Sequence, residues 1–273
     1  MTCTNTVRAK SPARFWSRRA VCAIVSLANN ANSPTHQLVF SGSNVLLTGV
    51  GSDGQVGEVV ARAFADLGAS LVLVDRTLEK AQARAAAITG SGQSARAYAC
   101  DLTNASEVSA LLDTVRQNHG DRLRALVHMV GGFAMSGPVA ESSADDWNRQ
   151  VTQHLGSAYL ATRAFLPLLR ADHGSIVLFS SQAALPGASI AAMSAYAIAK
   201  TGVATLMRAI AAEERKNGVR ANALAPGAIR TAANLSTMGD KVRYVAREDV
   251  AAAVTFLCSE HASAISGVLL PLA

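Results

Sequence analysis

The chain has 273 residues, of which 50% are apolar, and a formal net charge of +6. The first 43 residues hold five basic residues and no acidic one, whereas the rest holds 20 basic and 19 acidic residues, so the body shows no charge pattern for nucleic acid. The four cysteines form no CxxC pair and the six histidines no HExxH motif, which argues against a disulfide framework and a zinc site. We therefore expect no metal.

Residues 1–42 are predicted to be a basic N-terminal extension, and residues 43–273 a single folded domain. The apolar run at 20–28 has nine residues, too few to span a bilayer. Three interpretations of the extension stay open: an organellar transit peptide, a twin-arginine export signal at residues 17–19, and a tail without a targeting role.

The first predicted elements, within residues 43–75, are an apolar strand, a glycine-rich turn, an amphipathic helix and a second apolar strand that ends at Asp75. Glycines in the turn let the backbone approach a pyrophosphate, whose charge the start of the helix favours. Asp75 follows Gly57 by 18 residues, a distance suited to binding a ribose diol. The pattern predicts a dinucleotide site, although a glycine cluster alone is often only a flexible turn.

Helical and strand patterns alternate through the rest of the chain. We expect helices at 78–88, 106–118, 145–169, 195–215 and 248–257, and strands at 95–100, 125–130, 175–179, 220–224 and 268–270. The alternation predicts an α/β fold: one Rossmann-like, doubly wound parallel sheet with helices on both faces and right-handed crossovers. Ligands of such sheets bind beyond the carboxyl ends of the strands. The residues expected on that rim are 48–57, Asp75, Asp101, 130–132, 180–182 and 225–229.

Tyr196 and Lys200 lie four residues apart at the start of a predicted helix, so they share one helix face. A tyrosine that exchanges a proton near neutral pH needs its pKa lowered by about three units, and a neighbouring ammonium acts in that direction. The spacing therefore predicts a proton-transfer pair at the rim. Taken alone, such a pair is more often ordinary helix surface.

Together these residues resemble the short-chain dehydrogenase/reductase family over residues 44–270. The matching segments, in chain order, are TGVGSDGQVG at 48–57, Asp75, CDLTN at 100–104, VGG at 130–132, SS at 180–181, YAIAK at 196–200 and NALAPGAIRT at 222–231. The resemblance implies an oxidoreductase that interconverts an alcohol and a carbonyl by hydride transfer. It also implies that Tyr196 handles the proton, that Lys200 lowers the tyrosine pKa and holds the nicotinamide ribose, and that Ser181 bonds the substrate oxygen. Ser181 as a simple turn cap and Lys200 as a solvated residue remain the alternatives.

The resemblance further implies a nicotinamide coenzyme held by the turn, the strand ends and the loop after residue 224. The implied contacts are Thr48, Gly49, Gly51, Gly54, Val56, Gly57, Asp75, Arg76, Asp101, Leu102, Gly131, Pro226, Gly227 and Ile229, together with Tyr196 and Lys200. Asp75 accepts from ribose hydroxyls and repels a 2′-phosphate, and Asp53 adds the same charge, so we expect NAD rather than NADP. Arg76 weakens that discrimination.

Four departures from the family pattern stand out. The glycine turn is two residues longer than usual, closer to the enoyl-reductase branch, and the usual NNAG is HMVGG at 128–132, which removes the bracing asparagine. His154 stands where relatives place an asparagine near the catalytic lysine. Because imidazole titrates near neutrality, we expect His154 to join the proton relay and His154→Asn to shift the pH–rate profile; simple packing in the helix is the alternative. Finally, the segment between Thr231 and Arg247 is short for a lid.

The expected substrate is a small organic alcohol or carbonyl compound. The pocket lining that the sequence suggests is apolar, favouring a hydrophobic or ring-bearing substrate, although the same residues also suit an ordinary core: Phe133, Met135, Ala184, Leu185, Met193, Ile229 and Leu235. The rival functions are an enoyl reductase and a non-catalytic dinucleotide-binding protein. We expect a homodimer or homotetramer, no membrane span, and a cytoplasmic location because reduced coenzyme is available there.

Overall fold

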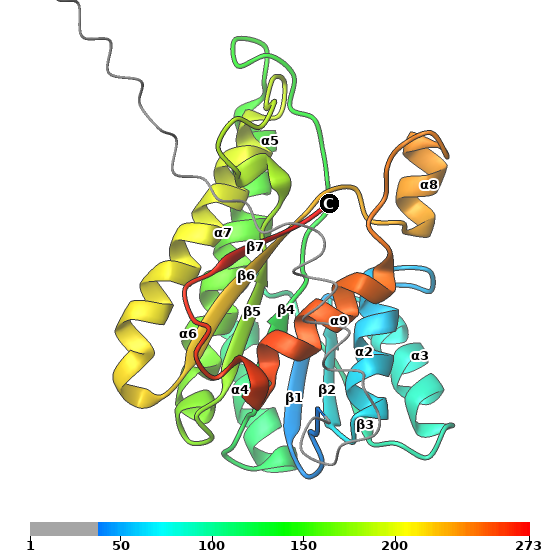
Figure 1. Ribbon diagram of the computed structural model, residues 1–273, viewed down its shortest axis with the longest axis vertical. Coiled ribbons are helices and arrows are strands. Elements are labelled where there is room, and N and C mark those ends of the chain that lie inside the picture. The colour runs from blue at the N-terminus through cyan, green and yellow to red at the C-terminus, as the bar shows by residue number, and fades with distance from the viewer. Residues whose placement is uncertain (1–37) are drawn as a thin grey trace, which may run out of the picture. The chain divides into compact units, whose positions relative to one another are not determined.

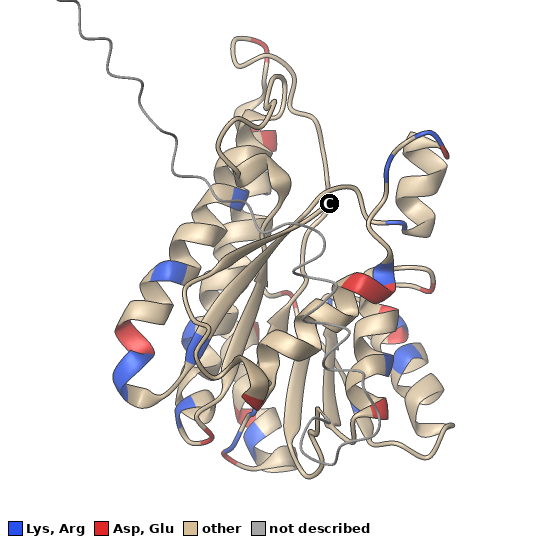
Figure 2. Ribbon diagram, in the orientation of Figure 1, with Lys and Arg blue, Asp and Glu red and all other residues tan. Residues whose placement is uncertain are grey.

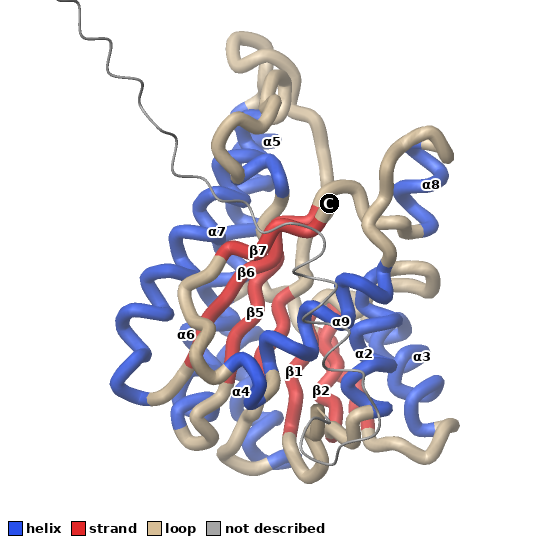
Figure 3. The backbone as a smooth tube through the Cα atoms, viewed as in Figure 1, coloured by secondary structure: helices blue, strands red, loops and turns tan. Residues whose placement is uncertain are grey.

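The computed structural model describes residues 38–273, and its centre is a seven-stranded parallel sheet in the order β3-β2-β1-β4-β5-β6-β7 (Figures 1 and 3). The strands are β1 Asn44–Thr48, β2 Ser70–Asp75, β3 Ala95–Ala99, β4 Ala125–His128, β5 Ser175–Phe179, β6 Arg220–Pro226 and β7 Leu269–Leu272. The order reverses between β1 and β4. This confirms the predicted Rossmann-like, doubly wound sheet.

Helices cover both faces of the sheet. Their bounds are α2 Val56–Asp66, α3 Leu78–Thr89, α4 Ala105–His119, α5 Ala144–Val151, α6 Ser157–Arg170, α7 Ser194–Glu213, α8 Ala232–Met238 and α9 Arg247–Cys258. Helix α2 packs against α3 and α9, whereas α4 packs against α6, and α5 against α7. Side-chain caps fix several starts; for example, Asn104 accepts from the amides of Ser106 and Glu107 at the start of α4.

The last crossover has the opposite hand to the one expected. Strands β4 to β7 follow one another in one direction across the sheet, so right-handed connections would place their helices on one face. Helix α9, between β6 and β7, instead lies beside α2 on the other face (Figure 1). The prediction of uniformly right-handed crossovers is therefore wrong at this unit. The buried side chains of α9, including Val250, Val254 and Leu257, lie on the face of the sheet that α2 also covers, and α9 packs against α2 there.

The sheet core follows from continuous apolar runs, as expected for parallel strands covered on both faces. The inner residues of β1, β2, β4 and β5 are buried. Charged side chains gather on the surrounding helices and loops (Figure 2). At the domain start, Phe40 is buried and its ring packs edge-on against Phe64, 5.0 Å between centroids. The predicted extension at 1–42 lies mostly outside the described residues.

Two elements differ from the predicted ones. The helix expected at 145–169 is broken by a π-helical segment, Thr152–Gly156, between α5 and α6. Such segments insert one residue into a helix and rotate the side chains that follow. Helix α8 was not predicted; it occupies part of the short segment between Thr231 and Arg247. Within the part of the chain described, no helix is long and apolar enough to cross a membrane.

Candidate active site

Lys200 is held at the rim by the end of β5. Only 5% of the residue is exposed, and its Nζ donates to the carbonyl of Phe179 at 2.8 Å. Ser180 Oγ in turn donates to the carbonyl of Lys200 at 2.8 Å, which joins the strand end to α7. Burial lowers the pKa of Lys200 to about 7. The lysine is therefore a buried group that exchanges its proton near neutral pH, and its solvated-surface alternative is wrong.

Tyr196 lies one helical turn before Lys200, with Lys200 Nζ 5.8 Å from its ring centroid. Burial raises the pKa of Tyr196, and a hydrogen bond with Ser181 lowers it in part. Lys200 is not among the causes of this shift, so its lowering of the tyrosine pKa stays a prediction. Lys200 Nζ donates to the carbonyl of Phe179 and makes no hydrogen bond with the phenol among the described residues.

Ser181 serves two purposes at the end of β5. Its Oγ accepts from the amide of Ala183 at 3.2 Å and so caps a short 3₁₀ turn, Gln182–Ala184. The same side chain lowers the pKa of Tyr196. The cap fixes the position of Ser181 Oγ at the rim, near enough to Tyr196 to act on its phenol. The cap and the site role are therefore compatible.

His154 lies in the π-helical segment, 1% exposed, with its ring edge-on to Tyr196 at 5.4 Å between centroids. Its Nε2 is bonded to Gln150 Oε1 at 3.0 Å, and its Nδ1 has no hydrogen-bond partner of good geometry among the described residues. Burial and then the charge of Lys200 lower the pKa of His154 to about 3, against a smaller opposing effect of the Gly132 backbone. The expectation that His154 titrates near neutrality is therefore wrong: it is a neutral imidazole.

His128 replaces the bracing that the missing asparagine would supply. Its Nδ1 is 2.9 Å from Thr48 Oγ1 and its Nε2 is 3.0 Å from Ser157 Oγ. Ser157 donates to the carbonyl of Gln153, so Ser157 Oγ accepts from Nε2–H and Thr48 donates to Nδ1. This chain links β1, β4 and the π segment, and the expected loss of bracing does not occur. Burial, and secondarily Lys200, lower the pKa of His128 to about 3.

Gly131 has no side chain, and this leaves open a space that His154 and Lys200 both face. A β-carbon added to it would lie 2.7 Å from His154 Nδ1 and 3.3 Å from Lys200 Nζ. Its φ of 155° also disfavours other residues. The histidine ring and the ammonium therefore face one point beside the end of β4, which only a glycine keeps open.

The glycine turn binds carboxylates of its own chain. The amide of Gly51 donates to Asp75 Oδ2 at 2.9 Å, and the amide of Gly54 donates to Glu58 Oε2 at 2.7 Å. Arg247, at the start of α9, pairs with the same Glu58 oxygen at 3.0 Å. The two amides at the start of α2 thus bind anionic oxygens, as a pyrophosphate site requires. Sequence patterns did not reveal Glu58 or Arg247, because their contact joins segments that are distant in the chain.

The side of the rim predicted to bind the adenosine is formed by the ends of β2 and β3. Asp75 Oδ1 also accepts from the amide of Thr77 at 3.2 Å. Asp53 is paired with Arg84 at 2.9 Å, which offsets the charge that was expected to repel a 2′-phosphate. Hydrogen bonds from Thr103 lower the pKa of Asp101, and nearby Arg76 adds to the effect. The other predicted residues on this side follow the same strand ends: Thr48, Gly49, Val56, Gly57 and Leu102.

The side of the rim predicted to bind the nicotinamide is formed by the loop after β6. Pro226 is buried, and the amide of Gly227 donates to the carbonyl of Leu272 at 2.9 Å. Gln182 reaches the same carbonyl at 3.1 Å, so the end of β7 joins this loop to the Ser181 loop. Ile229 forms a parallel bridge with Val245, which fixes the base of α8. The predicted positions therefore come together from separate strands.

The dinucleotide predicted from the sequence fits this rim. The start of α2 already binds anionic oxygens, Asp75 lies at the end of β2, and the point beside Gly131 offers the unpartnered Nδ1 of His154. No cluster of three potential metal ligands occurs in residues 38–273. Two hydroxyl groups beside a buried lysine suit proton exchange with a carbonyl oxygen.

Comparisons with known proteins agree with this geometry. A family model described as Enoyl-(Acyl carrier protein) reductase matches residues 49–272. D-threitol dehydrogenase of Mycolicibacterium smegmatis is 32% identical over 240 residues, covering 84% of this chain and 90% of that protein. 2-(S)-hydroxypropyl-CoM dehydrogenase 3 of Xanthobacter autotrophicus is 30% identical over 241 residues, which cover 82% of this chain and 93% of that protein.

Solved structures give the same result. A short-chain type dehydrogenase/reductase from Mycobacterium ulcerans superposes with a TM-score of 0.77 at 30% identity, covering 86% of this chain and 89% of that one. The matches span nearly the whole sheet and its helices. The chain therefore belongs to the short-chain dehydrogenase/reductase family and is a nicotinamide-dependent oxidoreductase acting between alcohols and carbonyl compounds.

Proposed function

We propose that Tyr196 is the proton donor and acceptor of this oxidoreductase, with Ser181 and Lys200 as its partners. The observation that carries the proposal is the placement of a buried lysine, with a pKa of about 7, one turn from a tyrosine whose pKa a rim serine lowers, with Lys200 Nζ 5.8 Å from the tyrosine ring centroid. When bound, the nicotinamide coenzyme supplies or accepts the hydride. In the reducing direction, Ser181 and Tyr196 donate to the carbonyl oxygen, and Tyr196 transfers its proton as negative charge develops there.

Lys200 restores that proton in this proposal. A phenolate formed at Tyr196 attracts the ammonium of Lys200, and the pKa near 7 lets Lys200 exchange with solvent at physiological pH. The kcat/KM for carbonyl reduction should therefore fall above about pH 7, and that for alcohol oxidation should rise there. In a Lys200→Met variant, the change of kcat/KM near pH 7 should be absent from the pH–rate profile.

We assign His154 a positioning role in the same relay. With Nε2–H donated to Gln150, Nδ1 carries a lone pair that faces the point shared with Lys200. A neutral imidazole there accepts a hydrogen bond, directly or through one water, and orients the lysine. Because its pKa is about 3, it acts without changing charge between pH 5 and 9.

NAD is the proposed coenzyme in preference to NADP. Asp75 is held by two backbone amides at the end of β2, where it can accept from a ribose diol. Arg76 is exposed beside it, but Asp53 is paired with Arg84 rather than with Arg76. Titrations with NADH and NADPH, followed by coenzyme fluorescence, test this choice; tighter binding of NADPH would overturn it.

The substrate is proposed to be apolar and to carry a ring. Phe133 and Met135 are 57% and 54% exposed, and the Phe133 ring lies edge-on to Tyr196 at 5.2 Å between centroids. The other suggested lining residues are half-buried rather than fully buried, which supports a lining role over an ordinary core: Ala184, Leu185, Met193, Ile229 and Leu235. An aromatic edge beside the proton donor suits a flat apolar substrate.

The decisive experiment is NADH oxidation against a panel of ketones and an enoyl thioester. Turnover of ketones, lost in Tyr196→Phe, supports the proposal. Turnover of the thioester alone would favour the enoyl reductase that the matching family model describes; the spacing of four between Tyr196 and Lys200 speaks against it. Coenzyme binding without turnover of either would favour the non-catalytic alternative.

A homo-oligomer built on α6 and α7 is also proposed. Tyr159 on α6 and Ile198 on α7 are each 50% exposed, and α5 packs against α7 nearby. Large apolar side chains at that exposure on neighbouring helices favour a partner surface. Light scattering tests the proposal, and a monomeric mass would contradict it.

A further inference from the structure

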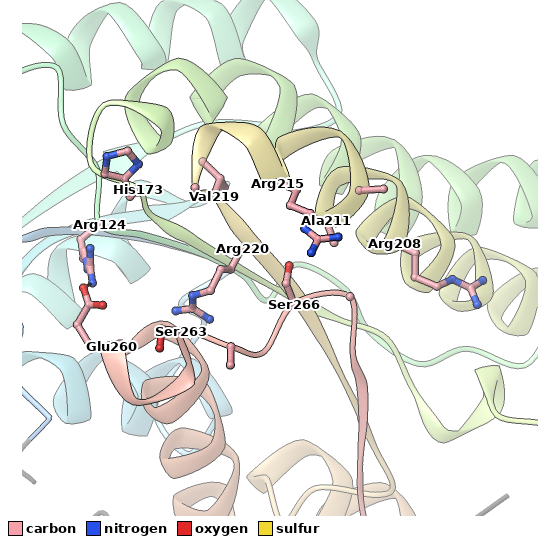
Figure 4. A pocket seen from close by; sticks show the side chains of 14 residues that line it. Arg124, His173, Arg208, Ala211, Arg215, Val219, Arg220, Glu260, Ser263 and Ser266 are labelled. Atoms are coloured by element: carbon pink, nitrogen blue, oxygen red, sulfur yellow. Dashed lines mark hydrogen bonds and ion pairs between the residues drawn. The ribbon is translucent and has the colours of Figure 1, made fainter.

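A basic groove lies at the opposite edge of the sheet from Tyr196. Arg124 immediately precedes β4, Arg220 begins β6 and Gly267 precedes β7, so the groove lies at the amino ends of the parallel strands. Its volume is about 750 Å³, within the range of small-molecule sites. Figure 4 shows its two walls, one from α7 and the turn after it and one from the segment between α9 and β7.

Positive charge dominates the lining of the groove. Four arginines, Arg124, Arg208, Arg215 and Arg220, line it together with a single carboxylate, Glu260. Glu260 pairs with Arg124 (Figure 4). The other three guanidinium groups have no acidic partner in residues 38–273. The positive charge of the lining arginines is therefore largely unpaired, and the resulting electrostatic potential in the groove favours an anion.

The free donors lie along the α7 wall. The guanidinium of Arg215 makes no hydrogen bond or ion pair with any described residue, and that of Arg208 bonds only Thr205 Oγ1, at 3.0 Å. The two arginines are seven residues apart, about two helical turns or ~10 Å. Between them, Ala211 and Ala212 leave room beside the helix. A ligand with several anionic groups can engage both ends.

The floor of the groove is rigid. Arg220 donates to the carbonyls of Leu257, Ile265 and Ser259 at 2.8 to 3.3 Å, which holds its side chain against the end of α9. Burial lowers the pKa of Arg220, and the charge of Arg124 acts in the same direction. An anion above this guanidinium relieves the repulsion between the two arginines without requiring the floor to move.

We propose that this groove binds a small polyanion, a compound with two or more phosphate or carboxylate groups, at a site separate from the catalytic rim. Arg208 and Arg215 provide direct contacts, Arg220 provides fixed positive charge, and the hydroxyls of Ser263 and Ser266 line the opposite wall. The proposal does not depend on the identity of the substrate or on the role of Tyr196.

Calorimetric titration with tripolyphosphate and with citrate, each at low and at physiological ionic strength, tests the proposal. We expect binding of at least one probe, weakened by salt, because the contacts are charge-assisted. Tighter binding of tripolyphosphate indicates a phosphate-bearing ligand, and tighter binding of citrate indicates a polycarboxylate. Absence of binding by both probes at low ionic strength would overturn the proposal.

The matched variants are Arg208→Gln with Arg215→Gln and, as a control, Arg163→Gln on α6. Arg163 is exposed and outside the groove, so it makes the same change of charge without touching the site. The double variant should weaken binding at least ~10-fold and the control less than ~2-fold. Equal affinity in the double variant would place the anion elsewhere, for instance at the start of α2, and would refute the site. A change of mass by light scattering in the double variant would show that a second copy covers the groove, which also refutes it.

Discussion

The coenzyme half of the sheet, β1 to β3, and the catalytic half, β4 to β6, use ionisable groups in opposite ways. In the first, Asp75 and Glu58 are partly exposed carboxylates bonded to backbone amides of the glycine turn. In the second, Lys200, His154 and His128 are buried, and burial lowers their pKa values to about 7, 3 and 3. In the proposed function, coenzyme binding therefore depends on backbone geometry, and proton transfer depends on the burial of the ionisable groups. Substitutions in the two halves should affect different measurements.

The largest expected effect is that of Tyr196→Phe, which removes the proposed proton donor while keeping the ring against Phe133 and His154. We expect kcat to fall about 10³-fold or more, within the range for loss of a positioned acid. The Kd for NADH should stay within ~3-fold of the parent value, because the phenol belongs to the catalytic half. Steady-state kinetics and coenzyme titration measure both. Unchanged kcat would remove the basis of the mechanism.

Gly131→Ala should damage both halves, because Gly131 lies where they meet. The added β-carbon would collide with His154 Nδ1 and approach Lys200 Nζ, at a φ that disfavours alanine. We expect a fall in kcat/KM of ~100-fold and a loss of about 1 to 3 kcal/mol in the free energy of unfolding. Gly132→Ala is the matched control, since nothing lies within 4 Å of its added carbon. Similar behaviour of the two variants would show that the point beside Gly131 is not occupied as described.

Asp75→Asn tests the coenzyme half alone. The amide keeps the shape but loses the charge that bonds Gly51 and the proposed ribose diol. We expect the Kd for NADH to rise ~10-fold and that for NADPH to change less, with kcat nearly unaffected. Asp53→Asn, whose parent residue pairs with Arg84 instead, should leave the ratio of the two affinities nearly unchanged. A fall in kcat as large as the loss of affinity would contradict the separation of roles.

His128→Asn should change stability toward acid more than activity. His128 is neutral in the folded state down to about pH 3, whereas the unfolded chain takes up its proton below the ordinary value of 6.5. The unfolded state therefore binds more protons between these values, and the free energy of unfolding falls as the pH falls. At pH 5 the variant should gain about 1 to 2 kcal/mol relative to the parent, compared with their difference at pH 8. Denaturant unfolding at both pH values measures this, and parallel pH curves would contradict it.

The smallest effect is expected for His154→Asn. Asparagine can still accept a hydrogen bond near Lys200, and His154 does not titrate near neutrality, so the limb of the pH–rate profile near 7 should move by less than ~0.5 units. His154→Leu offers no acceptor and should lower that limb by about one unit, because Lys200 becomes harder to keep charged. Equal profiles for the two variants would show that His154 only packs.

The fold and much of the candidate site could be predicted because their signals are local. Apolar runs, the glycine turn and the spacing of Tyr196 and Lys200 each lie within a few residues, and parallel strands bring their carboxyl ends to one rim. The bond between Glu58 and Arg247 could not be predicted, because it joins positions 189 residues apart. The π segment that carries His154 has no local signature either, since its sequence is that of an ordinary helix.

Residue types and their spacing were enough to establish the doubly wound sheet, the order of its elements and the residues that can exchange a proton. The folded structure sets their protonation: burial lowers the pKa of Lys200 to about 7 and those of His154 and His128 to about 3, and it raises the pKa of Tyr196. It also decided that α9 lies beside α2 and that three arginines without acidic partners, among the described residues, meet in one groove. The physical reason is that residue type and spacing set what a group can do, whereas burial and distant neighbours set its protonation.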